Sequence, residues 1–264
     1  MESSGFYVQL PSTSNASMDL FPNNKLCCYK TQLPRTLNFQ HNYEVGLVEI
    51  QYPNSWKTFY EENSYTVNIQ HLPGFPDSDL SKVSLHSVAL PREQYTNITE
   101  LINKVQLEVN MIGIENGWGD NVLTIEENKL ERKLVFFIKQ DVFLMFSDEF
   151  CEMVGLTKGR FIGGTVHTEH RYDINHGFRS LYVYCDICEP QFVGDVMVPL
   201  LRTVAVEGER GDYITRIYDV PHYIPVSLNG INTIEINIKD DTGVDVPFID
   251  GKVMCKLHFR PKSI

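Results

Sequence analysis

The sequence has few basic residues and no long apolar run. Its 264 residues include 23 Lys and Arg against 34 Asp and Glu, so the formal net charge is −11. Binding nucleic acid as a main function requires a basic surface or stripe, and the Lys and Arg of this chain are scattered, so specific nucleic-acid binding is not expected. A membrane-spanning helix needs roughly 18 or more apolar residues in succession. No segment has that length, so no membrane span is expected.

A secretory signal and a disulfide framework are also missing. The segment Met1–Phe21 has no basic stretch followed by an apolar one, so the chain is expected inside the cell. Six cysteines are present, but Cys27 and Cys28 are adjacent, and nothing else indicates an oxidising compartment. Reduced thiols are therefore expected.

No complete catalytic motif is present. The sequence has neither a Gly-x-Ser-x-Gly elbow nor a phosphate-binding Gly-Lys-Ser/Thr loop. Asp241-Thr242-Gly243 resembles the triplet of retroviral aspartic proteases, but it follows Lys239 and Asp240 rather than an apolar strand, which favours a solvated turn. The sequence therefore predicts a protein that is not an enzyme and uses no cofactor.

Two groups of histidine or cysteine are candidate metal sites, but the spacing of neither group predicts a metal. His167, His170 and His176 have a spacing that matches no established ligand motif, and the glycines around them indicate an exposed loop. Cys185-Asp-Ile-Cys188 is a single CxxC pair, whereas a structural zinc site needs a second pair. Buried or edge thiols are the expected role of these two cysteines.

Most of the chain shows the alternating, β-branched and aromatic pattern of β-strands. Helical periodicity is confined to Asn97–Val105, where Asn97 and Glu100 form a capping box, and to Ser147–Val154, which Gly155 is placed to end. The candidate strands are Gly5–Leu10, Leu26–Leu33, Tyr43–Gln51, Ser64–Gln70, Lys82–Ala89, Gln106–Ile112, Asn121–Ile125, Lys133–Lys139, Arg179–Asp186, Val198–Val206, Tyr213–Asp219, Thr233–Lys239 and Lys252–Arg260.

Many short strands with only two short helices predict an all-β fold, a β-sandwich or barrel. Because such folds commonly extend to about 200–250 residues, residues 1–264 are predicted to form a single domain. The segment Pro91–Phe178 contains both predicted helices, and its sequence pattern differs from that of the two ends of the chain. It is predicted to be a small α/β subregion inserted between strands of the sandwich.

Arg210-Gly211-Asp212 is the integrin-recognition triplet. It lies between two candidate strands and is expected in an exposed hairpin loop. A three-residue match also fits an ordinary polar turn, so a receptor-binding loop and a turn both remain open here.

Three long segments rich in Pro, Tyr and Trp resemble a viral protein family. The first includes Phe6-Tyr-Val-Gln-Leu-Pro, Asn15-Ala-Ser-Met-Asp-Leu-Phe-Pro-Asn-Asn and Tyr43-Glu-Val-Gly-Leu-Val-Glu-Ile-Gln-Tyr-Pro-Asn-Ser-Trp56. The second is Leu181-Tyr-Val-Tyr-Cys-Asp-Ile-Cys-Glu-Pro-Gln-Phe-Val-Gly-Asp195, followed by Val198-Pro-Leu-Leu-Arg202. The third combines Val220-Pro-His-Tyr-Ile-Pro-Val, Ile234-Glu-Ile-Asn-Ile-Lys-Asp-Asp-Thr-Gly and Pro247-Phe. From about Phe6 to Arg260 the chain resembles the minor capsid (penton) protein of Maverick/Polinton elements and adintoviruses, most weakly over Pro91–Phe178.

The resemblance implies a jelly-roll β-sandwich that stands at the five-fold vertex of an icosahedral capsid. Five copies would form a ring, a homopentamer, beside the double-jelly-roll major capsid protein. The protein would then be made in the host cell cytoplasm and reside in the virion. The pentons of adenoviruses, which are similar to this class, carry an Arg-Gly-Asp triplet in an exposed loop, so a host receptor is a further candidate partner for Arg210, Gly211 and Asp212.

Two alternatives belong to other functional classes. A jelly-roll binding module would recognise a cell-surface glycan or receptor through its loops, with Trp56 and Trp118 as exposed stacking residues. A metal-dependent jelly-roll enzyme of the cupin type would use His167, His170 and His176, but a fourth ligand on a later strand is missing.

Overall fold

The computed structural model divides the chain into two compact units. Unit 1 comprises Met1–Trp56 and Phe178–Ile264, and unit 2 comprises Lys57–Gly177. The structure describes residues 5–39, 42–58, 66–73, 85–90, 95–157, 160–175 and 179–262. Each unit has a hydrophobic core of its own.

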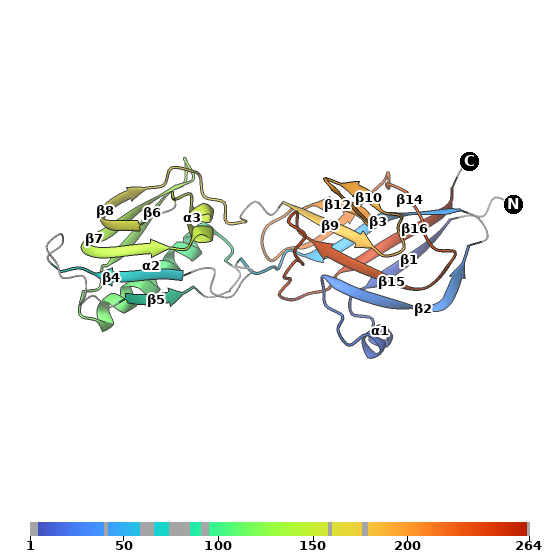
Figure 1. Ribbon diagram of the computed structural model, residues 1–264, viewed down its shortest axis with the longest axis horizontal. Coiled ribbons are helices and arrows are strands. Elements are labelled where there is room, and N and C mark those ends of the chain that lie inside the picture. The colour runs from blue at the N-terminus through green and yellow to red at the C-terminus, as the bar shows by residue number, and fades with distance from the viewer. Residues whose placement is uncertain are drawn as a thin grey trace. The chain divides into compact units, whose positions relative to one another are not determined.

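Unit 1 is a sandwich of two antiparallel sheets (Figure 1). Sheet A has the order β1 (Phe6–Pro11), β16 (Met254–Pro261), β3 (Tyr43–Pro53) and β13 (Tyr213–Ile217), and β14 (Ile224–Pro225) pairs with a different part of β3. Sheet B has the order β12 (Leu200–Ala205), β9 (Ser180–Cys185), β15 (Gly230–Lys239) and β2 (Cys28–Asn38). The first and last strands of the chain, β1 and β16, lie side by side. Along the chain β1, β2, β3 and β9 alternate between the two sheets, and so do β14, β15 and β16. This interleaved order is a jelly roll.

The core of unit 1 lies between the two sheets, and the alternation of its strands explains why. In β15, Ile234, Ile236 and Ile238 are all fully buried, and the residues between them are not. Because side chains two residues apart share a face of a strand, this alternation directs one face of sheet B inward. The predicted strand Thr233–Lys239 is therefore confirmed, and with it the β-sandwich fold class.

Two smaller elements of unit 1 were not predicted from the sequence. Helix α1 (Asn15–Leu20) packs beside β2, where the Ser17 hydroxyl accepts a hydrogen bond from the Gln32 amide at 3.1 Å. Between β9 and β12 the chain forms a two-stranded hairpin of β10 (Gln191–Val193) and β11 (Val196–Val198). Both elements are shorter than the window over which periodicity can be recognised.

Unit 2 has a single antiparallel sheet with helices packed on it. The order is β5 (Leu85–Ala89), β4 (Thr66–His71), β7 (Lys133–Phe146) and β6 (Leu123–Asn128), and β8 (Arg160–His167) also pairs with β7. Helix α2 (Ile98–Glu115) runs along this sheet in Figure 1, and α3 (Asp148–Val154) follows β7. Apolar residues of α2 at helical spacing, including Leu101, Val105 and Val109, are fully buried in the core of unit 2.

Helix α2 overturns one strand prediction. The segment Gln106–Ile112 alternates like a strand, but in the structure it forms the second half of α2. Residues Val105 and Val109 continue the apolar stripe begun by Leu101, because helical positions four apart share a face. The predicted start is confirmed: the Asn97 side chain accepts a hydrogen bond from the Glu100 amide at 2.9 Å.

The Glu100 carboxylate takes a different partner from the one that a capping box predicts. It accepts from the Thr96 amide at 2.8 Å and from the Thr96 hydroxyl at 2.9 Å rather than from the Asn97 amide. In α3, Ser147 is at the predicted N-cap position, but its side chain makes no capping bond. The predicted end is confirmed, since Gly155 has a φ of 80° in the left-handed region.

Strand β8 corrects the loop that was expected around Gly163 and Gly164. Opposite these residues the pairing of β7 with β8 shifts, from Ile138 with Gly164 to Phe143 with Ile162, so β7 bulges there. A Cβ on Gly163 would lie 2.3 Å from the carbonyl oxygen of Gln140. The glycine is needed because the bulged backbone passes directly over it.

In the chain, unit 2 lies between β3 and β9 of the jelly roll. It includes β4 and β5, which precede Pro91, because β4 pairs with β7 along its length. The single domain and the insertion boundaries Pro91–Phe178 remain predictions. Within the described ranges, no helix has the length and apolar character needed to cross a membrane.

Candidate interaction surface

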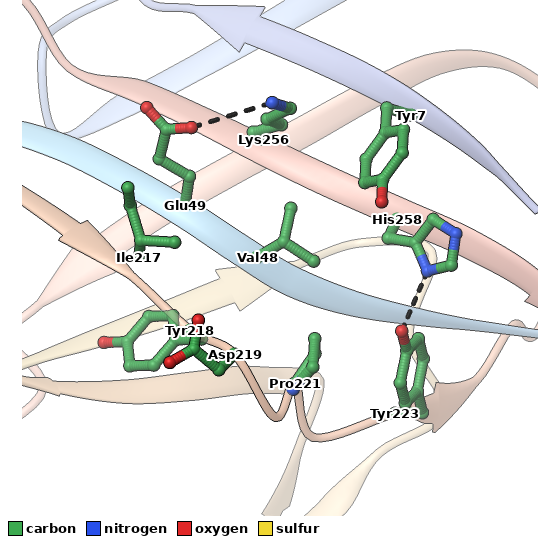
Figure 2. Close-up of a pocket in the computed structure, with 10 residues that line it drawn as sticks. All are labelled: Tyr7, Val48, Glu49, Ile217, Tyr218, Asp219, Pro221, Tyr223, Lys256 and His258. Atoms are coloured by element: carbon green, nitrogen blue, oxygen red, sulfur yellow. Dashed lines mark hydrogen bonds and ion pairs between the residues drawn. The ribbon is translucent and has the colours of Figure 1, made fainter.

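The outer face of sheet A carries a groove of about 300 Å³. Val48 lies in its middle, and the chain segment that follows β13 forms one wall (Figure 2). Tyr7 and Ile217 remain mostly exposed to solvent although they are large and apolar. We call this site the sheet A groove; it is lined by Tyr7, Val48, Glu49, Ile217, Tyr218, Asp219, Pro221, Tyr223, Lys256 and His258.

Strand order explains why the groove forms. β13 pairs with the second half of β3, and β14 pairs with the start of β3. Between them the chain leaves the sheet, so residues 218–223 form a wall instead of another strand. Gly46 allows this wall to approach β3, because a Cβ there would lie 2.9 Å from the carbonyl oxygen of His222 and 3.1 Å from Pro221.

One end of the groove is a cluster of aromatic and basic side chains. The Tyr223 hydroxyl lies 2.8 Å from Nδ1 of His258, and the ring of Tyr7 is 4.6 Å from the His258 ring (Figure 2). The Arg260 guanidinium lies 3.5 Å from the centre of the Tyr223 ring, and its Nε is 2.5 Å from the Glu44 carboxylate. Partial burial, and then the charge of Arg260, lower the pKa of His258, so the neutral imidazole is favoured at this end.

The other end of the groove holds an ion pair. Nζ of Lys256 lies 3.7 Å from the Glu49 carboxylate and 5.3 Å from the centre of the Tyr7 ring. Lys256, His258 and Arg260 alternate along β16, so all three belong to the outer face of sheet A. The groove thus combines apolar walls with charged side chains that are largely paired, because Lys256 faces Glu49, Arg260 faces Glu44 and Asp219 also lines it.

The β10–β11 hairpin is the most exposed apolar element of unit 1. Phe192 and Met197 are directly opposite each other in the hairpin, and their exposed fractions are 82% and 58%. Gly194 has a φ of 61°, which allows the tight turn. Sequence reasoning missed this hairpin; the signal that could have found it is the Gly194-Asp195 pair, a two-residue turn between the short runs around Phe192 and Met197.

The Arg-Gly-Asp loop connects β12 in sheet B to β13 in sheet A, so it is not the hairpin that was expected. Gly211 and Asp212 are exposed, and Arg210 is half-buried. The Asp212 carboxylate accepts a hydrogen bond from the Glu209 amide at 2.8 Å, and the Gly211 amide donates to the carbonyl of Asn54 at 2.8 Å. The triplet is therefore presented at the surface, while its acidic side chain helps to hold its own turn.

Two of the three histidines of the candidate metal group lie in the described residues. His167 ends β8, His170 is in the exposed segment after it, and His176 lies outside the described residues. Over the described part of the chain, no three His, Cys, Asp or Glu residues are grouped so as to hold a metal ion.

All six cysteines are free, with no disulfide between any two of them. Cys185 and Cys188 are buried, which agrees with their predicted role as core thiols. The Cys185 thiol donates a hydrogen bond to Cys188, which together with burial raises the pKa of Cys185 well above its ordinary value, and burial raises the pKa of Cys255 to about 12. Both thiols stay protonated, whereas a nucleophile or metal ligand must be a thiolate.

Two further expectations have different outcomes. Asp241-Thr242-Gly243 is a turn, as predicted, and the buried Asp240 carboxylate holds it by accepting from the Thr242 amide and hydroxyl at 2.9 and 2.7 Å. Trp56 is not an exposed stacking residue, because it is 2% exposed and packs edge-on against Phe248. Trp118 is half-buried, with its ring stacked on His71 at 5.1 Å.

The interleaved strands and the α/β unit between β3 and β9 define the class of the chain as a jelly-roll protein with a second compact unit. The mavirus penton protein, whose crystal structure was determined with selenomethionine, has a similar fold. The likeness covers 98% of this chain and 99% of that one, with a TM-score of 0.54 and 10% identity. No family model and no curated protein matches the sequence. The chain therefore has a penton-like fold, as its sequence resemblance implied.

Proposed function

We propose that this protein is a non-enzymatic structural protein of a virion, the penton of an icosahedral capsid. The observation that carries the proposal is the penton-like fold over 98% of the chain, found at only 10% identity. The resemblance of its Pro- and Tyr-rich segments to the pentons of Polinton/Maverick elements and adintoviruses supports the same role independently. The protein would act at the capsid vertex after synthesis in the host cell cytoplasm.

Assembly would be its mechanism. Five copies would close a ring, and the ring would be seated among double-jelly-roll major capsid proteins. A closed ring uses two unlike surfaces of each subunit, because one flank meets the opposite flank of the next copy. The groove on sheet A and the exposed β10–β11 hairpin are two unlike surfaces of unit 1, which supports this part of the proposal.

Native mass spectrometry of the purified full chain tests this function. A five-fold mass is expected, together with incorporation of the protein into particles formed with the major capsid protein. A monomer at high concentration that is also absent from such particles would contradict the proposal. A glycan-binding module is less well supported, because Trp56 is buried.

The Arg-Gly-Asp loop gives the penton a second proposed role in receptor binding, which its exposure favours. Asp212→Glu tests this role through attachment of assembled protein to cells. Because Asp212 also accepts from the Glu209 amide, that change could disturb the loop itself. Arg210→Lys keeps the Asp212 turn and the charge, so receptor binding predicts that both variants lose attachment while pentamers form. Unchanged attachment in both variants would contradict the role.

A further inference from the structure

We propose that residues 17–25, which include most of α1, guard the free edge of β2 and prevent it from pairing with β2 of a second copy. This segment is called the edge guard below. β2 is the outermost strand on one side of sheet B, and an uncovered edge strand presents unpaired N–H and C=O groups to any other strand. The guard acts within a single copy, so this inference goes beyond the proposed ring and does not require it.

The hydrogen-bonding pattern of β2 shows which of its backbone groups face away from sheet B. On the β15 side, the Cys27 carbonyl accepts from the Ile238 amide at 2.6 Å. Successive residues of an antiparallel strand direct their N–H and C=O groups to opposite sides, so Cys28, Lys30 and Gln32 turn theirs toward the outer edge. Each of these three residues therefore has an N–H and a C=O group that β15 cannot satisfy.

Two side chains of the edge guard bind these outward groups in place of a neighbouring strand. The Asn24 amide donates from Nδ2 to the Lys30 carbonyl and accepts at Oδ1 from the Lys30 N–H, both at 2.9 Å. The Gln32 amide donates to the Ser17 hydroxyl at 3.1 Å, and Ser17 is buried. Asn24 thus reproduces the paired bonds that a residue of another strand would make with Lys30.

The rest of the outer edge is closed as well. The Cys28 carbonyl accepts from the Lys25 amide at 2.7 Å, so the guard satisfies four of the six outward groups. Beyond Gln32 the strand continues into Pro34, which has no amide hydrogen, and into Arg35, which is exposed and charged. Proline and charge both discourage pairing at an edge.

The strand that the guard excludes is β2 of another copy. β2 has 11 residues and is the longest strand of sheet B, so its bare edge would offer the longest template. Two identical edge strands can pair antiparallel across a two-fold axis, and such a contact joins copies in pairs. A ring instead uses two unlike surfaces of each copy. On the proposed function, the guard would therefore remove a contact that competes with the ring.

Amide hydrogen exchange of the full chain tests the guard. Ser17→Ala combined with Asn24→Ala removes both side-chain contacts. Ser14→Ala combined with Asn23→Ala is the matched control, because in the described structure neither of those side chains bonds to β2. At low concentration, NMR should show the Lys30 amide exchanging roughly tenfold faster in the first variant than in the control, since its acceptor is gone.

The individual amides make this test specific. The Tyr29 amide faces β15 and should keep its protection in every variant. Asn24→Ala alone should accelerate exchange of Lys30 but not of Gln32, which keeps its bond to Ser17. This single change also provides the measurement if the double variant is too unstable to study. Equal exchange of Lys30 in Asn24→Ala and in the control would overturn the inference.

Self-association is the second measurement. In sedimentation velocity, the double variant should form dimers at a concentration roughly tenfold below that at which the control associates, because the guard no longer competes for the edge. Benzoylphenylalanine in place of the exposed Arg35, in mixed ¹⁴N-labelled and ¹⁵N-labelled chains, should crosslink to β2 of the other copy. Association no stronger than that of the control, or crosslinks elsewhere, would overturn the inference. The oligomeric state of the wild type enters neither result, so failure of the guard and failure of the penton proposal are distinguishable.

Discussion

The two units bury their apolar residues by different means. Unit 1 encloses its core between two sheets, whereas unit 2 packs helices against one sheet. Their charges also differ: unit 1 has 12 Lys and Arg against 16 Asp and Glu, and unit 2 has 11 against 18. The groove, the exposed hairpin and the Arg-Gly-Asp loop all belong to the less acidic unit 1. On the proposed function the sandwich would provide the contact surfaces, whereas unit 2 is a separately packed and more acidic unit.

Truncation of one large core residue in each unit gives the largest expected effect. Phe259 in unit 1 is fully buried with its ring stacked on Phe6 at 5.1 Å, and Phe150 in unit 2 is fully buried with its ring stacked on Phe146 at 5.0 Å. Phe259→Ala and Phe150→Ala should each lower the free energy of unfolding of their own unit by about 3–5 kcal/mol, since each leaves a cavity. Because the cores are separate, each variant should leave the other unit's transition in place.

Separate probes make this measurement clear. Each unit contains one of the two tryptophans, so Trp56 fluorescence in a Trp118→Phe background follows unit 1. Circular dichroism at the helix band follows α2 in unit 2. Urea unfolding of both variants is then recorded with both probes. If either variant shifts both transitions equally, the two units unfold as one cooperative body. That result would contradict the view that their cores are independent.

The sandwich was easier to predict from the sequence than unit 2 for a physical reason. A strand of the sandwich has one face inward, so Ile234, Ile236 and Ile238 alternate with polar residues and identify it. In α2 the run Gln106–Ile112 alternates as well, and only the stripe from Leu101 through Val109 shows that the segment is helical. Local alternation cannot decide between these patterns when a helix has apolar residues on more than one face.

The candidate site was less predictable than the fold. The residues of the sheet A groove come from β1, β3, β16 and the segment after β13, which are distant in sequence. Tyr7 and His258 are brought together only by the pairing of the first and last strands. The glycines Gly163 and Gly164 were predicted to lie in a loop. Composition alone does not show that Gly163 is instead in a strand and faces a bulge of the neighbouring strand. The sequence was sufficient to predict that the Arg-Gly-Asp triplet lies in a connection between two strands. It was not sufficient to predict that this connection joins one sheet to the other.

Replacing a glycine by alanine should have an intermediate effect on the free energy of unfolding, and this effect should again differ between the two units. In Gly163→Ala of unit 2, the new Cβ would lie 2.3 Å from the Gln140 carbonyl oxygen and 2.5 Å from its Cα. Gln140 lies in the bulge of β7, between residues that pair with neighbouring strands on both sides, so its backbone can move little and a loss of about 1–3 kcal/mol is expected in the unit 2 transition. Gly46→Ala in unit 1 should cost less, because its contacts at 2.9 and 3.1 Å involve residues 221–222, which lie outside the strands.

The control for both glycine variants is Gly230→Ala. Its nearest atom would be 3.4 Å from the new Cβ, an ordinary contact, so a change within about 0.5 kcal/mol is expected. A Gly163→Ala protein as stable as this control would show that β7 does not bulge over β8 as described.

Titration of His258 should give the smallest effect, and it should be confined to unit 1. Its pKa is lowered in the folded state by partial burial and by Arg260, so the folded protein binds fewer protons here than the unfolded chain. The resulting contribution to stability is therefore full above the ordinary histidine pKa of about 6.5 and is lost as pH falls through the lower folded value. His258→Asn keeps a polar side chain beside Tyr223 but removes the titration, so the wild type should lose more stability than this variant between about pH 7 and pH 5. Urea unfolding followed by Trp56 fluorescence should show that difference, and the helix signal of unit 2 should not. Parallel pH curves for the two proteins would mean that the neutral imidazole contributes nothing to the groove, and a difference in the unit 2 signal would mean that the two units are coupled.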